Sequence, residues 1–331
     1  MIISRTPFRI SFFGGGSDFA SHFCRHGGKV ISVAINKYCY LNVRQLPPFF
    51  SHRHRVVYSK TENVSSFAEI EHPAVRAILE YLDPDCGVSI LHDGDIPARS
   101  GIGSSSAFTV GLLNSLCHLL KRPLNARELA ETAIYIEQEL IGETVGCQDQ
   151  ICCAYGGFNV IDFPQEGGFK LKPVTMHQAR LQDFKAHMLL IFTGISRISS
   201  LVAQEQKKRL PENSSRLIQL ADFASKAEKI LCSGADLKEF GELLHQSWLI
   251  KRSLSDLVSN PKLDEIYNLG MQAGAYGGKL LGAGAGGFML FFARPDKHPA
   301  ILQALQEYLH VPFDFDCEGS KIIFSGQEGV C

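Results

Sequence analysis

The sequence predicts a two-domain protein that mixes helices with strands, and three observations support this. The 331 residues are enough for two ordinary domains, and 45% of them are apolar, which allows a substantial core. Residues 1–190 alternate strand-like and helical segments, whereas residues 197–274 follow almost only the helical period. We therefore place a domain boundary near 190–195, which divides the chain into residues 1–190 and 191–331.

The first half of the chain is expected to alternate strands with helices. β-Branched and aromatic residues are typical of strands, while apolar residues three and four positions apart are typical of helices. These patterns predict strands at 2–13, 29–46, 54–59 and 86–92, and a hairpin made of 158–163 and 169–174. They predict helices at 71–82, 104–121 and 126–141, of which the second is apolar nearly all round and is expected to be buried.

The second half is expected to be mainly helical around a small number of strands. A buried strand is predicted at 187–194, and the helical segment 197–274 carries apolar side chains on one face. A hairpin broken by glycines follows at 279–293, then a helix at 297–309 and a strand near 319–325.

Composition and charge exclude several classes of function. The net charge is −1 and the charged residues are interspersed, which argues against a nucleic-acid partner. No segment reaches the roughly 20 apolar residues of a membrane span, and Arg5 and Arg9 interrupt the apolar N-terminus, so no signal peptide is predicted. The ten cysteines form no C-x-x-C pair, which favours reduced, buried thiols at Cys147, Cys152 and Cys153. We expect a cytoplasmic protein without a membrane partner, either a monomer or a homo-oligomer.

A turn rich in glycine and serine, residues 101–106, precedes the predicted buried helix. Glycines let the backbone approach a ligand closely, and a helix N-terminus carries a partial positive charge of about half a unit. Together these features form an anion-binding site, to which serine hydroxyls add donors or a magnesium ligand. The alternative is a serine-capped helix with a flexible entry, which the turn alone fits equally well. The turn is neither a Walker A loop nor a Rossmann G-x-G-x-x-G.

Two further glycine-rich turns favour the phosphate-binding interpretation. Residues 6–18, TPFRISFFGGGSD, form an apolar strand that carries a lone Arg9 and ends in three glycines and an acid. Residues 279–288, KLLGAGAGGF, place another such turn between apolar strands. Three turns of this kind, widely separated and each next to an apolar run, are difficult to explain by packing alone.

In this order, the three segments resemble the motifs of the GHMP small-molecule kinases, and the resemblance covers the chain end to end. It implies an α+β fold, with an N-terminal domain like ribosomal protein S5 domain 2 and a C-terminal domain built on a ferredoxin-like sheet. The ligands of this family lie in the cleft between the two domains. The resemblance also implies a phosphotransferase that uses ATP and Mg²⁺ on a small-molecule acceptor.

Finer features resemble one branch, the D-glycero-D-manno-heptose 7-phosphate kinases, which phosphorylate the anomeric hydroxyl to give a 1,7-bisphosphate. The stretches that carry this are INKYCYL (35–41), GCQDQ (146–150) and TGISRISS (193–200). A galactokinase would be expected to read G-E-H-T-D where residues 14–18 read GGGSD. L-Fucose kinases share the glycine-rich first motif and are the nearest alternative. Galacturonate and N-acetylhexosamine 1-kinases, and a non-catalytic sugar- or nucleotide-binding regulator, also stay open.

The resemblance implies that the phosphate turn binds the nucleotide and that a helical acid binds the metal. Ser105 is expected to ligate Mg²⁺ together with Glu137. Glu139 is the alternative acid, because residues two apart on a helix face different directions and only one of them points inward. The residues expected to bind nucleotide are Pro97, Ser100, Gly101, Ile102, Gly103, Ser104, Ser105 and Ser106.

The resemblance implies that Asp149 is the general base and that Arg9 is its partner. A positioned base of this type contributes on the order of 10²–10⁴ in rate. Arg9 would pair with Asp149 and stabilise charge on the transferred phosphoryl group. The alternatives are a helix N-cap role for Asp149, serving 150–155, and a purely structural ion pair with Arg9.

The sugar is expected to lie against the first glycine turn. Asp18 would accept hydrogen bonds from sugar hydroxyls, although a turn-capping role is a serious alternative. Arg197 is the first candidate for holding a distal phosphate, with Lys37, Lys251 and Arg252 as weaker ones. The residues expected to bind substrate are Gly14, Gly15, Gly16, Asp18, Arg197 and Gly284.

Overall fold

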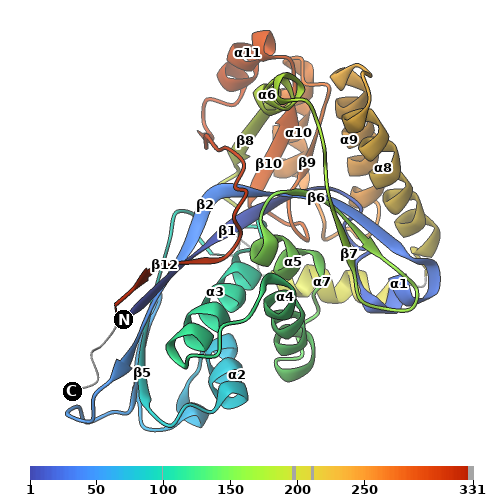
Figure 1. Ribbon diagram of the computed structural model, residues 1–331. Coiled ribbons are helices and arrows are strands. Elements are labelled where there is room, and N and C mark those ends of the chain that lie inside the picture. The colour runs from blue at the N-terminus through green and yellow to red at the C-terminus, as the bar shows by residue number, and fades with distance from the viewer. Residues whose placement is uncertain (99, 196–198, 210–211, 327–331) are drawn as a thin grey trace.

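The computed structural model describes residues 1–98, 100–195, 199–209 and 212–326, and it confirms the α+β class (Figure 1). The larger of two sheets runs in the order β12-β1-β2-β5-β3-β4, with β6 paired to β2 and β7 paired to β6. All its pairs are antiparallel except β3 with β5. Its strands are β1 (Ile2–Phe13), β2 (Gly28–Leu46), β3 (His54–Val57), β4 (Thr61–Val64), β5 (Gly87–Gly94), β6 (Phe158–Phe163), β7 (Lys170–Pro173) and β12 (Lys321–Ser325).

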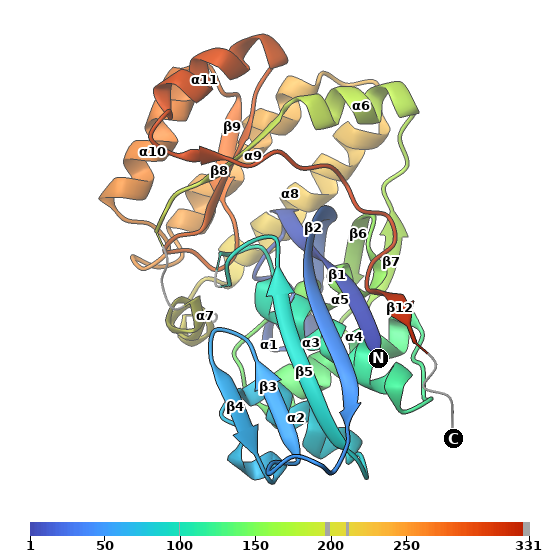
Figure 2. The ribbon, with the colours of Figure 1, turned by 90° about the vertical axis from the view of Figure 1, so that its left-hand side faces the viewer.

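Helices cover one face of this sheet, as the side view in Figure 2 shows. The central one is α3, which packs on β1 and β2 and buries eleven of its residues, as its all-round apolar sequence predicts. The helices on this side are α2 (Pro73–Leu82), α3 (Ser104–Leu119), α4 (Ala126–Tyr135), a π-helical turn (Ile136–Leu140) and α5 (Gln148–Tyr155). A short helix, α1 (Ala20–His26), follows the first glycine turn.

The smaller sheet is antiparallel in the order β11-β8-β10-β9. Helix α9 packs on β9, while α8 contacts α9 and also reaches β1 and β2 of the first sheet. The strands are β8 (Met188–Phe192), β9 (Gly277–Leu280), β10 (Phe288–Phe292) and β11 (Leu309–His310). The helices are α6 (Gln178–Ala186), α7 (Ser199–Lys208), α8 (Ser214–Cys232), α9 (Leu237–Arg252), α10 (Pro261–Gln272) and α11 (His298–Ala304).

The chain crosses between the two sheets twice. The division expected at residues 190–191 falls inside β8, which pairs with β10 and β11 in the second sheet. After β11 the chain returns, and β12 pairs with β1 in the first sheet. The two termini of the fold therefore meet on one sheet, with the second sheet inserted between them (Figure 1).

Several elements differ from the sequence-based expectation. Helices α1, α5 and α6 and the short strand β4 were not predicted, because each is only four to nine residues long. The helix expected at 297–309 ends at Ala304, since Leu309 and His310 pair with β8 and tertiary pairing outweighs local preference there. Among the described residues, no helix is long and apolar enough to cross a membrane.

Candidate active site

The phosphate turn and the third glycine turn lie in direct backbone contact. A Cβ atom on Gly282 would lie 2.6 Å from Gly101 Cα, and one on Gly287 would lie 2.1 Å from the carbonyl oxygen of Ser100. No side chain fits at either place, so these glycines are required by the close approach of the two chain segments. The strand that precedes the first glycine turn also contacts the phosphate turn, because the backbone N–H of Arg9 donates to the carbonyl of Ile102 at 3.0 Å.

Helix α3 begins at Ser104 without a side-chain cap. Gly103 occupies the N-cap position at φ 76°, and within the described part of the chain no side chain caps the helix. The alternative of a serine-capped helix is therefore not what the structure shows. A Cβ on Gly103 would lie 3.1 Å from Arg9 Cγ and 3.4 Å from Asp149 Oδ2, so the helix start faces this pair of residues. An anion at the helix N-terminus would meet the positive end of the helix dipole there.

Arg9 and Asp149 form a bidentate ion pair, as the sequence predicts. Arg9 Nε donates to Asp149 Oδ1 at 2.7 Å, and Nη2 donates to Oδ2 at 2.6 Å. The third guanidinium nitrogen, Nη1, donates to the carbonyl of Gly101 at 2.8 Å. The Arg9 side chain is 5% exposed, whereas that of Asp149 is 24% exposed. The buried Arg9 side chain thus fixes the orientation of the carboxylate, which stays partly exposed to solvent.

Asp149 lies in the first turn of α5 but does not occupy its N-cap. Cys147 takes that position and makes no side-chain cap hydrogen bond. The N-cap alternative for Asp149 is therefore excluded by the geometry. The pairing with Arg9 is compatible with both a catalytic base and a structural ion pair.

Glu137 points inward and Glu139 points outward, which resolves the choice between these two acids. The π-helical turn places Glu137 at 1% exposure, and Glu139 is exposed. π-Helical turns are frequent at functional sites. Burial raises the pKa of Glu137 to about 7, although hydrogen bonds from neighbouring side chains act in the other direction. Its Oε1 is buried and makes no hydrogen bond of normal geometry to the described residues, although the side chain of Thr109 also acts on this carboxyl.

The serine that contacts Glu137 is Ser106, whereas the sequence prediction assigned Ser105 to the metal. Ser106 Oγ donates to Glu137 Oε2 at 3.0 Å, and Gln150 Nε2 donates to the same oxygen. Ser105 lies on the exposed side of the first helical turn. Adjacent residues of a helix face different directions, so only one of these two serines in the first turn of α3 points toward Glu137. The buried Oε1 of Glu137 suits a hard cation such as Mg²⁺, which prefers oxygen ligands.

The first glycine turn is closed by Asp18. Gly16 N donates to Asp18 Oδ1 at 2.9 Å, and Gln148 N donates to Oδ2 at 3.2 Å. Asp18 is 1% exposed, and burial raises the pKa of its carboxyl. In this structure Asp18 therefore caps the turn and ties it to the start of α5. Its role in binding a sugar hydroxyl stays a prediction.

Two lysines that sequence reasoning treated as minor hold the third glycine turn in place. Lys279 Nζ donates to the carbonyls of Ser11 and Phe12, each at 2.8 Å, and so anchors the strand that leads into this turn. Lys251 Nζ donates to the carbonyls of Leu280 and Gly282. Lys251 was a candidate for a distal phosphate, but its ammonium lies among main-chain oxygens at the glycine turns.

The remaining predicted residues are less closely associated with this site. Pro97 is exposed. Gly284 packs against the backbone of Val258, where a Cβ on the glycine would lie 2.8 Å from Val258 Cα. Arg252 forms a surface ion pair with Asp264 at 3.1 Å. Arg197 lies outside the described residues.

The three cysteines around Asp149 are buried and free, as predicted. Burial raises the pKa of the Cys147 and Cys152 thiols to about 12 and moves that of Cys153 upward as well. Because the thiolate is the nucleophilic form, these residues are packing groups and not reactive ones.

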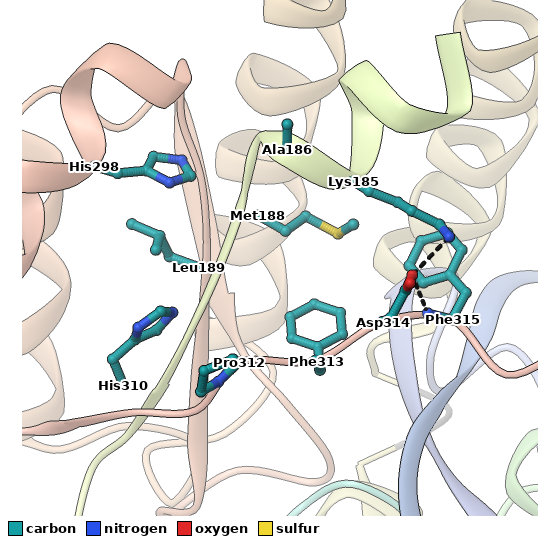
Figure 3. Close-up of a pocket in the computed structure, with 10 residues that line it drawn as sticks. All are labelled: Lys185, Ala186, Met188, Leu189, His298, His310, Pro312, Phe313, Asp314 and Phe315. Carbon is teal, nitrogen blue, oxygen red and sulfur yellow. Dashed lines mark hydrogen bonds and ion pairs between the residues drawn. The ribbon is translucent and has the colours of Figure 1, made fainter. Parts of the chain in front are cut away.

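A separate hollow of about 220 Å³ lies away from the glycine turns, beside β8 and the segment that follows β11 (Figure 3). Lys185 and Asp314 form an ion pair at its rim, 2.6 Å apart. His298 and His310 line its other side, with Leu189 between them (Figure 3). None of the predicted site residues that the structure describes lines this hollow.

Comparison with known proteins decides the family. The family model for the GHMP kinases N terminal domain matches residues 69–157, and that for the GHMP kinases C terminal domain matches residues 204–311. The chain is 30% identical to a D-glycero-alpha-D-manno-heptose 7-phosphate kinase of Campylobacter jejuni, over 97% of this chain and 98% of that one. The chain belongs to the GHMP kinase family.

Two further relatives of this GHMP kinase have lower sequence identity. A bifunctional fucokinase/GDP-fucose pyrophosphorylase of Arabidopsis thaliana is 24% identical over 93% of this chain, which spans 31% of that larger protein. A D-glycero-D-manno-heptose 1-phosphate kinase from Bacteroides thetaiotaomicron shares the fold with a TM-score of 0.78, at 24% identity over 98% of this chain and 100% of the other. The kinase is thus a sugar kinase, a phosphotransferase with an alcohol acceptor, and kinases of this family use ATP as donor.

Proposed function

We propose that this kinase transfers the terminal phosphate of ATP to the anomeric hydroxyl of D-glycero-D-manno-heptose 7-phosphate, giving the 1,7-bisphosphate. Similarity to a heptose 7-phosphate kinase along the whole of both chains supports the substrate. The observation that carries the reaction is the accessible carboxylate of Asp149, held by Arg9 at the start of α3. A nucleotide whose phosphates rest on that helix start would present its terminal phosphate to a hydroxyl beside Asp149.

The residues divide the work of phosphoryl transfer in a simple way. The backbone from Gly101 to Ser106 binds the phosphates, because the glycine turn and the helix dipole favour anions. Asp149 accepts the proton of the attacking hydroxyl as the new P–O bond forms and ADP leaves. Arg9 fixes the direction of that carboxylate and adds positive charge near the transferred group.

Glu137 and the serines at the start of α3 would hold Mg²⁺. The cation, when bound, neutralises charge on the phosphates. Glu137 suits this role because no hydrogen bond of normal geometry reaches its buried Oε1 from the described residues, while Ser106 and Gln150 fix the other oxygen. Either hydroxyl, Ser105 by its exposure or Ser106 by its contact with Glu137, is in a position to contribute.

A substrate panel tests this proposal. ADP release should be measured with ATP, Mg²⁺ and either heptose 7-phosphate, L-fucose, D-galactose or D-mannose, and the product examined by ³¹P NMR. We expect heptose 7-phosphate to give the highest kcat/KM and a second phosphorus signal from an anomeric phosphate. A higher kcat/KM with L-fucose would replace the proposal with a fucose 1-kinase, which the similarity to a plant fucokinase makes the main competitor.

Arg197 is proposed to bind the distal phosphate of the substrate. Arg197→Ala should raise the KM for heptose 7-phosphate without changing the KM for ATP. Arg294→Ala is the matched control, because Arg294 is a surface residue paired with Asp296. An unchanged KM for heptose 7-phosphate in Arg197→Ala would remove this residue from the substrate site.

A further inference from the structure

The second sheet and its helices bring two lysine side chains to the glycine turns. Lys279, on β9, is 4% exposed and binds the carbonyls at the end of β1. Lys251, near the end of α9, binds the carbonyl of Leu280 at 3.1 Å and that of Gly282. Gly282 in turn lies against Gly101. The Lys251 ammonium is therefore separated from the phosphate turn by one backbone segment.

The charges at this place are not balanced. Among the described residues, the charged groups that act on Lys251 are Arg9 and Asp149, and those that act on Lys279 are Lys251 and Arg9. Arg9 and Lys251 thus act on one carboxylate, that of Asp149, and Arg9 already binds both oxygens of that carboxylate. Burial together with the charge of Arg9 lowers the pKa of Lys251 to about 7. Charges removed from water are normally paired, so this arrangement favours an added anion.

The two lysines differ in how an anion would reach them. Lys279 is almost completely covered, whereas Lys251 keeps intermediate exposure. Lys251 belongs to α9, which packs on the second sheet, and through Gly282 it reaches the phosphate turn that precedes α3. An anion held between the start of α3 and Lys251 would be bound by backbone amides of α3 on one face and by the Lys251 charge on the other.

We propose that Lys251 recognises the terminal phosphate of the bound nucleotide, so that the site distinguishes a triphosphate from a diphosphate. This rests on the proposed placement of ATP on the phosphate turn. The hydrogen bonds to Leu280 and Gly282 hold the ammonium in position, and its positive charge makes the site prefer the triphosphate over the diphosphate. A negative charge next to the ammonium would also favour its protonated form, so binding of the triphosphate and protonation of Lys251 support each other.

Substitutions at Lys251 separate its charge from its hydrogen bonds. Lys251→Gln keeps two N–H donors for the carbonyls but loses the charge, Lys251→Met loses both, and Lys251→Arg keeps the charge. Lys238→Met is the matched control, because Lys238 lies on the same helix α9 and is half exposed in a surface pair with Glu242. Binding of a non-hydrolysable ATP analogue and of ADP, each with Mg²⁺, should be measured for every variant by isothermal titration calorimetry, with the melting temperature as a check of folding.

We expect Lys251→Gln and Lys251→Met to raise the Kd of the triphosphate at least tenfold and that of ADP less than threefold. Lys251→Arg and Lys238→Met should stay within threefold of the wild type for both nucleotides. If Lys251→Gln binds the triphosphate with the Kd of the wild type, the inference is overturned and Lys251 is a structural anchor. An equal rise in the Kd of both nucleotides would overturn it as well. No sugar is present, so an incorrect sugar assignment leaves this result unaffected, while a wild type that binds neither nucleotide overturns the placement of ATP itself.

Discussion

Replacing Asp149 by asparagine should abolish most of the activity while leaving the fold intact. The carboxylate accepts two charge-assisted hydrogen bonds from Arg9, at 2.7 and 2.6 Å. Asparagine keeps one acceptor for Arg9, so we expect the loss of one such bond, about 1.5–3 kcal/mol of stability. The amide cannot accept a proton, so kcat should fall by about 10²–10⁴, equivalent to about 2.7–5.5 kcal/mol in the barrier.

The assay is ADP release at saturating ATP and sugar, with the melting temperature measured in parallel. Asp222→Asn is the control, because Asp222 is an exposed aspartate on α8. A second variant separates a base from a structural ion pair: Arg9→Met combined with Asp149→Asn removes both charges together. If the pair were only structural, the double variant would regain stability and activity over the single one. Recovery of activity in the double variant, or an Asp149→Asn protein within tenfold of the wild type, would refute the reasoning.

Three further predictions concern the glycine turns, the metal and the response to pH. Gly101→Ala should be nearly inactive in the ADP assay, because its Cβ would lie 2.7 Å from the Leu281 carbonyl oxygen. The control is Gly142→Ala, at a similar φ of 75° but with open space around it, which should lose only about 1–2 kcal/mol of stability and keep its activity. Glu137→Gln should raise the Mg²⁺ concentration for half-maximal activity at least about tenfold, a loss of about 1.4 kcal/mol in binding, and an unchanged Mg²⁺ titration would remove Glu137 from the metal site. Burial lowers the pKa of His54 to about 4, so below pH 6.5 the unfolded chain binds a proton that the folded chain does not, and the folded state loses stability as the pH is lowered. Between pH 7 and pH 5 the free energy of unfolding of His54→Gln should therefore fall by about 2 kcal/mol less than that of the wild type, as measured by denaturant unfolding. The control His177→Gln, at an exposed position, should behave as the wild type.

The parts of the fold that the sequence predicts best are the long periodic ones. The strand expected at 2–13 is β1, and the helix expected at 104–121 is α3, because a continuous pattern over more than ten residues leaves little ambiguity. Helix α5 was missed because glycines at 142, 146, 156 and 157 frame an eight-residue segment and give it the composition of a loop. Its formation depends on tertiary contacts, including the carboxylate of Asp18 that accepts from its first N–H.

The site could be predicted where a motif fixes both residue type and position, and not where side-chain direction decides. The Arg9–Asp149 pair follows from the resemblance, and the structure places the two together. The contact of Ser106 with Glu137 depends on which face of the first α3 turn points inward. It also depends on the π-helical turn at Glu137, which no sequence pattern predicts. The role of Lys251 is set by residues 29 and 31 positions away, so no local signal could have indicated it.

The proposed reaction requires the terminal phosphate of ATP to lie between the start of α3 and the carboxylate of Asp149. A crystal structure with a non-hydrolysable ATP analogue, Mg²⁺ and the sugar phosphate tests it most directly. We expect phosphate oxygens on the backbone amides of residues 103–106, the cation on Glu137, and the anomeric hydroxyl within hydrogen-bond distance of Asp149. A nucleotide bound elsewhere, or an acceptor hydroxyl out of reach of Asp149, would contradict it.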